Sequence, residues 1–317
     1  MKNTIRRRAL IVGVVGALAL GTAACNRGPE ASQGNGEGNH KIALAISTLN
    51  NPFFIQLRDG AQEAAKELGV TLEVTDAQDD ASTQQNQLAN AATQGVDAVI
   101  INPVDSEAAG AAVTPVLEAK IPVIAVDRSV EGKEVDSTVS SDNVAGGKQA
   151  AEALAKAIGE KGNVIVLQGV AGTSASRDRG AGFQEGIKQF PNIKVVAMQP
   201  ANFARAQGLD VATNLLQSNP DAVGIFAEND EMALGAIQAL GARAGKDVFV
   251  VGFDGTEDGL KAISDGTLSA TIAQQPAELG KEAVKAAVAK LKGESIDKDI
   301  PVEVKTVDSS NVSEFSK

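Results

Sequence analysis

Short apolar runs and amphipathic segments alternate along the chain from residue 41 onward. We predict strands where Val, Ile and Ala dominate, at residues 42–47, 72–75, 98–102, 123–127, 164–168, 194–198, 223–227, 249–253 and 270–273. Alanine-rich segments of helical periodicity lie between them, for example at 84–94, 106–119, 146–158, 183–190, 206–217 and 232–240. Near-continuous apolar strands that alternate with helices are typical of a parallel sheet buried on both faces. These strands are many for one doubly wound sheet, so we predict an α/β fold with two Rossmann-like lobes.

One strand–turn–helix segment, residues 47–61, carries two amides and two phenyl rings at its turn. Asn51 and Pro52 favour a turn after the apolar run, and a helical pattern follows. In an open α/β sheet such a turn lies where ligands bind. Amides that both donate and accept, beside flat apolar rings, suit a sugar. The alternative is that Phe53 and Phe54 belong to the core and that the asparagines only form the turn.

Polar side chains lie where most of the predicted strands end. They are Asn51, Asn102, Asp127 with Arg128, Asn229 with Asp230, Asp254 and Gln274. Parallel strands place such positions on one edge of each sheet, so two lobes that face each other there form a cleft lined by donors and acceptors. A single Asn or Asp at a strand end often caps the next helix instead. We interpret Asp105 and Asp230 as caps, and Glu228 as a surface or cap residue.

The composition excludes several classes of site. One His and one Cys exclude a metal site built from several such residues, and also Ser-His-Asp and Cys-His catalysis. An enzyme that uses only carboxylates is not excluded by composition. The glycine-rich segment 169–180 fits no nucleotide-binding pattern, so we expect neither a cofactor nor a metal. The formal charge of −11 makes the chain a poor candidate for binding nucleic acid or an anionic membrane surface.

The first 24 residues are typical of an export signal. Lys2 and residues 6–8 supply positive charge, and residues 9–20 form an apolar core that is short for a bilayer span. Two alanines precede Cys25, as in a lipoprotein signal, so we predict that Cys25 is lipidated and begins the mature chain. The alternative is ordinary secretion with a free thiol. Residues 25–40 are predicted to be this lipidated Cys and a flexible tether, because they are rich in Gly, Asn, Ser and Glu.

The chain from Lys41 to Val307 resembles periplasmic sugar-binding proteins of the ribose-binding type. The resemblance rests on STLNNPFF (47–54), INPVDS (101–106), VDRS (126–129), SDNVAGGK (141–148), LQGVAGTSASRDRG (167–180), QPANF (199–203), ENDEMALGA (228–236), VGFDGT (251–256) and ATIAQQP (270–276). It implies a type I periplasmic binding protein fold, with two parallel-sheet lobes joined by a three-segment hinge near residues 140–142, 274–276 and 301–304. The N-terminal lobe is then 41–141 plus 275–302, and the C-terminal lobe is 142–274 plus 303–317.

The resemblance also implies a set of sugar-contacting residues. They are Asn51, Phe53, Phe54, Asn102, Asp127 and Arg128 from the first lobe, Arg179, Phe203, Asn229 and Asp254 from the second, and Gln274 from the hinge. The phenyl rings are expected to cover the sugar faces. The aspartates accept hydrogen bonds from hydroxyl groups, and the arginines donate hydrogen bonds and balance the charge of the buried carboxylates. The amides both donate and accept.

The resemblance further implies a function without catalysis. We expect a monomeric, lipid-anchored protein outside the cytoplasm that captures D-ribose between two closing lobes and delivers it to the permease of an ABC importer. Two alternatives stay open. The ligand is another pentose or a hexose, or the closed protein is a sugar sensor that docks a chemoreceptor or a kinase.

Overall fold

The computed structural model describes residues 40–315, so the predicted signal peptide, Cys25 and most of the tether lie outside the described residues. Within that range the strands form two six-stranded sheets. The first has the order β11 (Asp299–Val302), β5 (Ser137–Ser141), β4 (Val123–Val126), β3 (Ala98–Ile101), β1 (Lys41–Ile46) and β2 (Thr71–Asp76). The second has the order β12 (Lys305–Asp308), β10 (Ala270–Ala273), β9 (Phe249–Asp254), β8 (Ala222–Ala227), β6 (Gly162–Gln168) and β7 (Ile193–Pro200). All pairings are parallel except that of β12 with β10.

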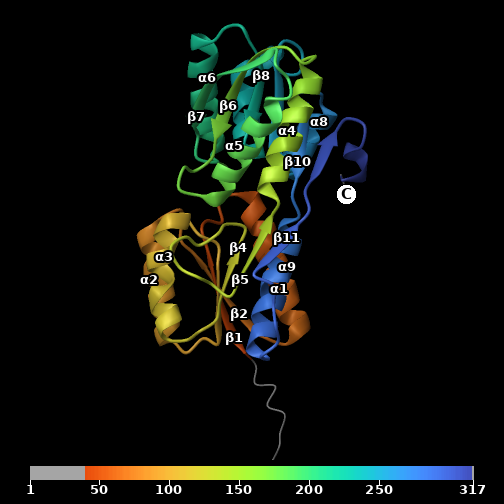
Figure 1. The fold of residues 1–317 in the computed structure, drawn as a ribbon. Coiled ribbons are helices and arrows are strands. Elements are labelled where there is room, and N and C mark those ends of the chain that lie inside the picture. The colour runs from red at the N-terminus through yellow and green to blue at the C-terminus, as the bar shows by residue number, and fades with distance from the viewer. Residues whose placement is uncertain (1–39, 316–317) are drawn as a thin grey trace, which may run out of the picture. The chain divides into compact units, whose positions relative to one another are not determined.

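Helices cover both faces of each sheet (Figure 1). The first sheet is flanked by α1 (Pro52–Leu68), α2 (Ala81–Thr93), α3 (Ser106–Glu118) and α9 (Pro276–Leu291). The second is flanked by α4 (Asn143–Ala157), α5 (Ser174–Ile187), α6 (Arg205–Ser218), α7 (Asp230–Leu240) and α8 (Glu257–Ser264). Two short 3₁₀ helices, η1 (Gly241–Arg243) and η2 (Val312–Glu314), complete the described chain. None of these helices is long and apolar enough to cross a membrane.

Strand β1 shows how the apolar pattern builds this architecture. Ile42, Leu44 and Ile46 pack with α1 and α9, whereas Ala43 and Ala45 pack with α2 and α3 on the opposite face. Successive side chains of a strand point to opposite faces, so a strand buried on both sides is apolar throughout. The predicted α/β fold with two lobes is therefore confirmed.

The sequence pattern missed three strands and the start of α5. β5 (STVSS) and β12 (KTVD) each contain a single apolar residue, and β11 (DIPV) is short and contains Pro301 at the edge of its sheet. Helix α5 begins at Ser174, where the Thr173 side chain caps it, and not at residue 183 as predicted. Its first turns are polar (SASRDR), so they lack the apolar periodicity that marks a helix.

The chain passes between the two sheets three times. It leaves the first sheet after β5, returns after β10, and leaves again between β11 and β12. These passages place the carboxyl-terminal edges of both sheets close together. The residues between Ser141 and Asn143, between Ala273 and Pro276, and between Val302 and Lys305 carry all three connections.

Helices α4 and α5 pack with direct backbone contact at Gly147. A Cβ atom on Gly147 would lie 2.2 Å from the carbonyl oxygen of Arg179 and 2.7 Å from the amide nitrogen of Phe183. We expect Gly147→Ala to lower the free energy of unfolding by about 1–3 kcal/mol, because the helices must move apart. Urea denaturation measures this loss. Glu152→Ala, on the exposed side of α4, is the control and should change stability by less than about 0.5 kcal/mol; equal effects of the two changes would contradict the packing argument.

Candidate functional site

A cavity of about 260 Å³ lies between the facing edges of the two sheets. Most of the side chains around it are polar or charged, so it suits a small polar molecule. Its walls are formed by Asn51, Phe53, Phe54, Asp127, Arg128, Ala175, Arg179, Phe203, Asn229, Asp254 and Gln274. Ten of the eleven residues expected from the sequence are in this set. The remaining one, Asn102, lies behind Asp127, and Ala175 is the lining residue that was not expected.

The two asparagines at helix starts both cap a helix and line the cavity. The Oδ1 atom of Asn51 accepts a hydrogen bond from the backbone of Phe53 (2.9 Å), and that of Asn229 accepts one from Met232 (2.9 Å). Capping fixes the side-chain rotamer. Asn51 and Asn229 therefore cap helices and line the cavity at the same time.

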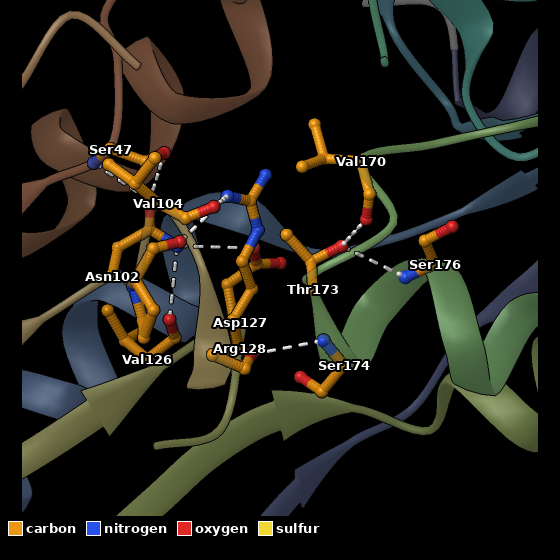
Figure 2. Close-up of polar contacts among 12 residues, drawn as sticks. Ser47, Asn102, Val104, Val126, Asp127, Arg128, Val170, Thr173, Ser174 and Ser176 are labelled. Carbon is orange, nitrogen blue, oxygen red and sulfur yellow. Dashed lines mark hydrogen bonds and ion pairs between the residues drawn. The ribbon is translucent and has the colours of Figure 1, made fainter. Parts of the chain in front are cut away.

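Asn102, Asp127 and Arg128 form a buried polar cluster in the first lobe (Figure 2). Asn102 accepts from the backbone and hydroxyl of Ser47 (3.1 and 2.6 Å) and donates to an oxygen of Asp127 (3.3 Å). The same oxygen lies 3.5 Å from Nε of Arg128, whose Nη1 donates to the carbonyl of Pro103 (2.7 Å). Asn102 thus orients the carboxylate from behind, and the cluster presents Asp127 and Arg128 to the cavity.

The second lobe and the hinge contribute a matching cluster around Arg179. Its Nε donates to Asn143 (2.9 Å), its Nη1 donates to the carbonyl of Glu228 (2.7 Å), and Nη1 lies 3.7 Å from an oxygen of Asp254. Gln274 donates to the same Asp254 oxygen (2.7 Å). Each lobe therefore places one carboxyl and one guanidinium at the cavity, which balances their charges.

Aromatic rings lie against these guanidinium groups. The Arg128 guanidinium carbon lies 5.2 Å from the centre of the Phe54 ring and 5.7 Å from that of Phe203. The Arg179 carbon lies 5.7 Å from the Phe203 centre. Phe53 and Phe54 pack edge to face and also belong to the apolar core of the first lobe, so they serve both roles that the sequence left open.

Three lining residues have left-handed backbone conformations. The φ angles are 66° for Asp127, 59° for Phe203 and 127° for Asp254. Such values are unusual outside glycine and concentrate at binding and catalytic sites, where the surrounding structure holds the strain. Here they turn the chain sharply, so that these side chains face the cavity.

Three buried polar atoms of the lining residues make no hydrogen bond within residues 40–315. They are Oδ1 of Asp127, Nε of Arg128 and Oε1 of Gln274. Buried polar atoms are nearly always hydrogen-bonded, so each one needs an explanation. Two acceptors and one donor around a small cavity match a ligand that carries several hydroxyl groups.

Glu228 and Asp230, interpreted from the sequence as surface or cap residues, are both completely buried, and Asn229 between them caps α7, so that interpretation is wrong. Asp105 does cap α3, through the backbone of Ala108. Asp230 instead accepts hydrogen bonds from the backbone and hydroxyl of Thr256 (2.8 and 3.0 Å) and the hydroxyl of Thr271 (2.7 Å).

Burial raises the pKa of four carboxyl groups at or beside the cavity. The pKa of Asp127 is raised although Arg128 opposes the shift, and that of Asp254 is raised well above its ordinary value although Arg179 opposes it. Burial also raises the pKa of Glu228 from an ordinary 4.5 to about 7, and that of Asp230 from 3.8 to about 6. The site therefore contains carboxyl groups that hold protons at higher pH than exposed ones do.

These pKa values predict that the free energy of unfolding falls between pH 5 and pH 7.5. In this window the unfolded chain has released the protons of Glu228 and Asp230, whereas the folded chain releases them only near pH 7 and 6. The stability that these two groups contribute is therefore greatest below their unfolded pKa values, and it declines by about 4 kcal/mol between pH 5 and pH 7.5. Urea denaturation of the sugar-free protein at both pH values tests this. The decline should be smaller in Glu228→Gln, and a stability that rises over the window would contradict the assignment.

The sequence pattern of the periplasmic binding protein domain matches residues 42–295. The chain belongs to the periplasmic binding protein family. Membership confirms the predicted family, its extracytoplasmic location and its role in binding solutes, and it confirms that the chain is not an enzyme.

Relatives and solved structures agree with this membership. The periplasmic binding protein is 50% identical to a ribose import binding protein of Salmonella typhimurium, over 84% of this chain and 90% of that one. It is 43% identical to a ribose import binding protein of Bacillus subtilis, over 94% of this chain and 98% of that one. A solute-binding protein from Actinobacillus succinogenes with bound D-allose superposes with a TM-score of 0.81 at 34% identity, covering 87% of this chain and 99% of that one.

Proposed function

We propose that this periplasmic binding protein captures D-ribose in the cavity between its lobes and delivers it to an ABC importer. The observation that carries the proposal is the set of buried, unbonded polar atoms on Asp127, Arg128 and Gln274. A pentose has hydroxyl groups that donate to the two acceptors and accept from the donor. Two of the three relatives named above are ribose import binding proteins, which favours ribose among small sugars.

All eleven predicted residues have a role in this proposal. Phe54 and Phe203 cover the sugar faces, and Phe53 supports Phe54 from its edge. Asp127 and Asp254 accept hydrogen bonds from sugar hydroxyl groups, while the two arginines donate. Asn102 orients Asp127 from behind. The other amide residues, which donate and accept, are Asn51, Asn229 and Gln274.

Direct hydrogen bonds between the lobes support a mechanism of closure around the sugar. The backbone of Ser129 donates to the hydroxyl of Ser174 (2.9 Å), and the backbone of Ser174 donates to the hydroxyl of Ser106 (3.1 Å). The backbone of Ser106 donates to the carbonyl of Gly172 (2.9 Å). A sugar that contacts both lobes favours this closed form over an open one, since ligands shift populations by their differential affinity. The closed form then presents a surface to the permease.

The lobe limits, the anchor and the oligomeric state complete the proposal. We assign residues 41–141 with 275–302 to one lobe and 142–274 with 303–317 to the other. We further propose that lipid-modified Cys25 holds a monomer at the membrane through a tether that ends near residue 40. Mass spectrometry of the membrane fraction tests the anchor: a diacylglyceryl mass on a peptide that begins at Cys25 is expected, and an unmodified Cys25 would contradict it.

Isothermal titration calorimetry with D-ribose tests the ligand, with D-allose, D-xylose and D-galactose as controls. We expect a Kd near the micromolar range for ribose, about −8 kcal/mol, and much weaker binding of the controls. Solved relatives hold D-allose and myo-inositol, so a hexose or a polyol is the second candidate ligand. Stronger binding of D-allose than of D-ribose would transfer the proposal to that sugar.

Ribose uptake by cells separates transport from sensing. Deletion of the protein should abolish uptake of labelled ribose at micromolar concentration, and re-expression should restore it. Normal uptake combined with loss of a chemotactic or transcriptional response to ribose would favour the sensor alternative.

A further inference from the structure

Glu228 joins three segments of the second lobe from a completely buried position. One of its carboxyl oxygens accepts hydrogen bonds from the backbone amide of Gly169 (2.7 Å) and from the hydroxyl of Ser176. Its own carbonyl accepts from Nη1 of Arg179 (2.7 Å). Glu228 does not line the cavity itself. It therefore connects the end of β8 to the β6–α5 loop and to α5.

The contact with Gly169 determines where the Phe203 ring lies. A Cβ atom on Gly169 would lie 2.0 Å from Cζ of Phe203, so the ring packs directly on the Gly169 backbone. Phe203 also has a left-handed φ of 59°, so its ring depends on its neighbours for its orientation. A displacement of Gly169 would therefore move the ring that faces both arginines of the cavity.

The contact with Ser176 fixes the start of α5. Ser176 and Arg179 are three residues apart, so they lie on the same face of the helix. Thr173 closes the preceding turn by donating to the carbonyl of Val170 (2.8 Å), and its hydroxyl accepts from the backbone of Ser176 (Figure 2). A Cβ atom on Gly180 would lie 3.0 Å from the other carboxyl oxygen of Glu228, so α5 passes close to the carboxyl.

We propose that the Glu228 carboxyl is a positioning group, which holds Phe203 and Arg179 in place for the sugar without touching it. The proposal rests on the proposed sugar site. Only an oxygen acceptor at this position satisfies both buried donors, and an apolar side chain leaves the Gly169 amide and the Ser176 hydroxyl unbonded. The role needs an acceptor and not a charge, so a glutamine should perform it.

The test compares Glu228→Leu with Glu228→Gln in the full-length protein, by calorimetry with D-ribose. We expect Glu228→Leu to raise Kd at least 30-fold and Glu228→Gln to stay within fivefold of the natural protein. Ile263→Ala, a core change in α8 of the same lobe, controls for lost stability and should leave Kd within threefold. Ribose binding by Glu228→Leu as tight as that of the natural protein, or binding by Glu228→Gln as weak as that of Glu228→Leu, would overturn the proposal.

Two further measurements keep the proposal testable if Glu228→Leu does not fold or if D-ribose is not the ligand. Gly169→Ala pushes directly on the Phe203 ring and should raise Kd at least tenfold with Glu228 intact; unchanged binding would contradict the link to Phe203.

In the sugar-free protein, the Gly169 amide should be protected from hydrogen exchange in the natural protein and in Glu228→Gln. Fast exchange in the natural protein would overturn the role of Glu228 whatever the ligand is, whereas failure to bind any sugar would overturn only the proposed function.

Discussion

Asp127→Ala should weaken binding of D-ribose at least 100-fold. The change removes the buried acceptor Oδ1, which has no other partner within residues 40–315, and it takes from Arg128 the carboxylate that balances its charge. Truncating one member of a buried charged pair typically costs about 2–5 kcal/mol of binding free energy. About 3 kcal/mol corresponds to a 100-fold change in Kd. Arg128 keeps its bond to the carbonyl of Pro103, so the lobe should still fold.

Calorimetry on three variants separates the causes of this loss. Asp127→Asn keeps the shape of the side chain and one acceptor but removes the charge. We therefore expect a Kd between that of the natural protein and that of Asp127→Ala. Asp59→Ala removes an exposed carboxylate of the same lobe, which pairs with the adjacent Arg58, and should leave Kd unchanged. A loss below tenfold in Asp127→Ala would remove this residue from the proposed site.

Arg179→Met should lower the free energy of unfolding by about 3–5 kcal/mol and abolish measurable ribose binding. Arg179 is the guanidinium beside buried Asp254, and it also bonds to Asn143 and to the carbonyl of Glu228. Removal of one member of a buried ion pair leaves the other charge uncompensated. The Arg179 guanidinium also lies 3.9 Å from the centre of the Phe253 ring, so packing is lost together with charge.

The loss caused by Arg179→Met should depend on pH. Burial already raises the pKa of Asp254, and without the opposing guanidinium it rises further. At pH 5 the Asp254 carboxyl can hold a proton and so avoid an unpaired charge. At pH 8 it either carries a buried unpaired charge or stays protonated far above its unfolded pKa, and both lower the free energy of unfolding. Urea denaturation should therefore show a larger loss at pH 8 than at pH 5. Arg177→Met, which removes a neighbouring exposed guanidinium paired with Glu131, is the control and should cost no more than about 1 kcal/mol. Equal losses in the two variants would contradict the buried pair.

The sequence predicted the parts of the site that follow apolar strands. Asp127 comes directly after β4 and Asp254 is the last residue of β9, and parallel pairing brings both to the edge where the lobes meet. Arg179 and Phe203 were expected only from the family resemblance. Arg179 lies inside a helix and Phe203 in a turn, where an arginine or a phenylalanine has no distinctive pattern.

The buried acids show where reading a single sequence fails. Glu228 and Asp230 flank a capping asparagine, and both positions usually face solvent. Their burial depends on partners far away in the sequence, Ser176 for one and Thr271 for the other. The missed strands have a related cause: β11 and β12 are edge strands whose residues pair on one side only, so their composition is mixed.

A crystal structure of the complex with D-ribose tests the central claim most directly. The sugar should lie between Phe54 and Phe203, with its hydroxyl groups within hydrogen-bond distance of Oδ1 of Asp127, Nε of Arg128 and Oε1 of Gln274. The interlobe bonds of Ser174 should also be present. A complex in which ribose lies outside this cavity, or leaves those three atoms unbonded, would contradict the account.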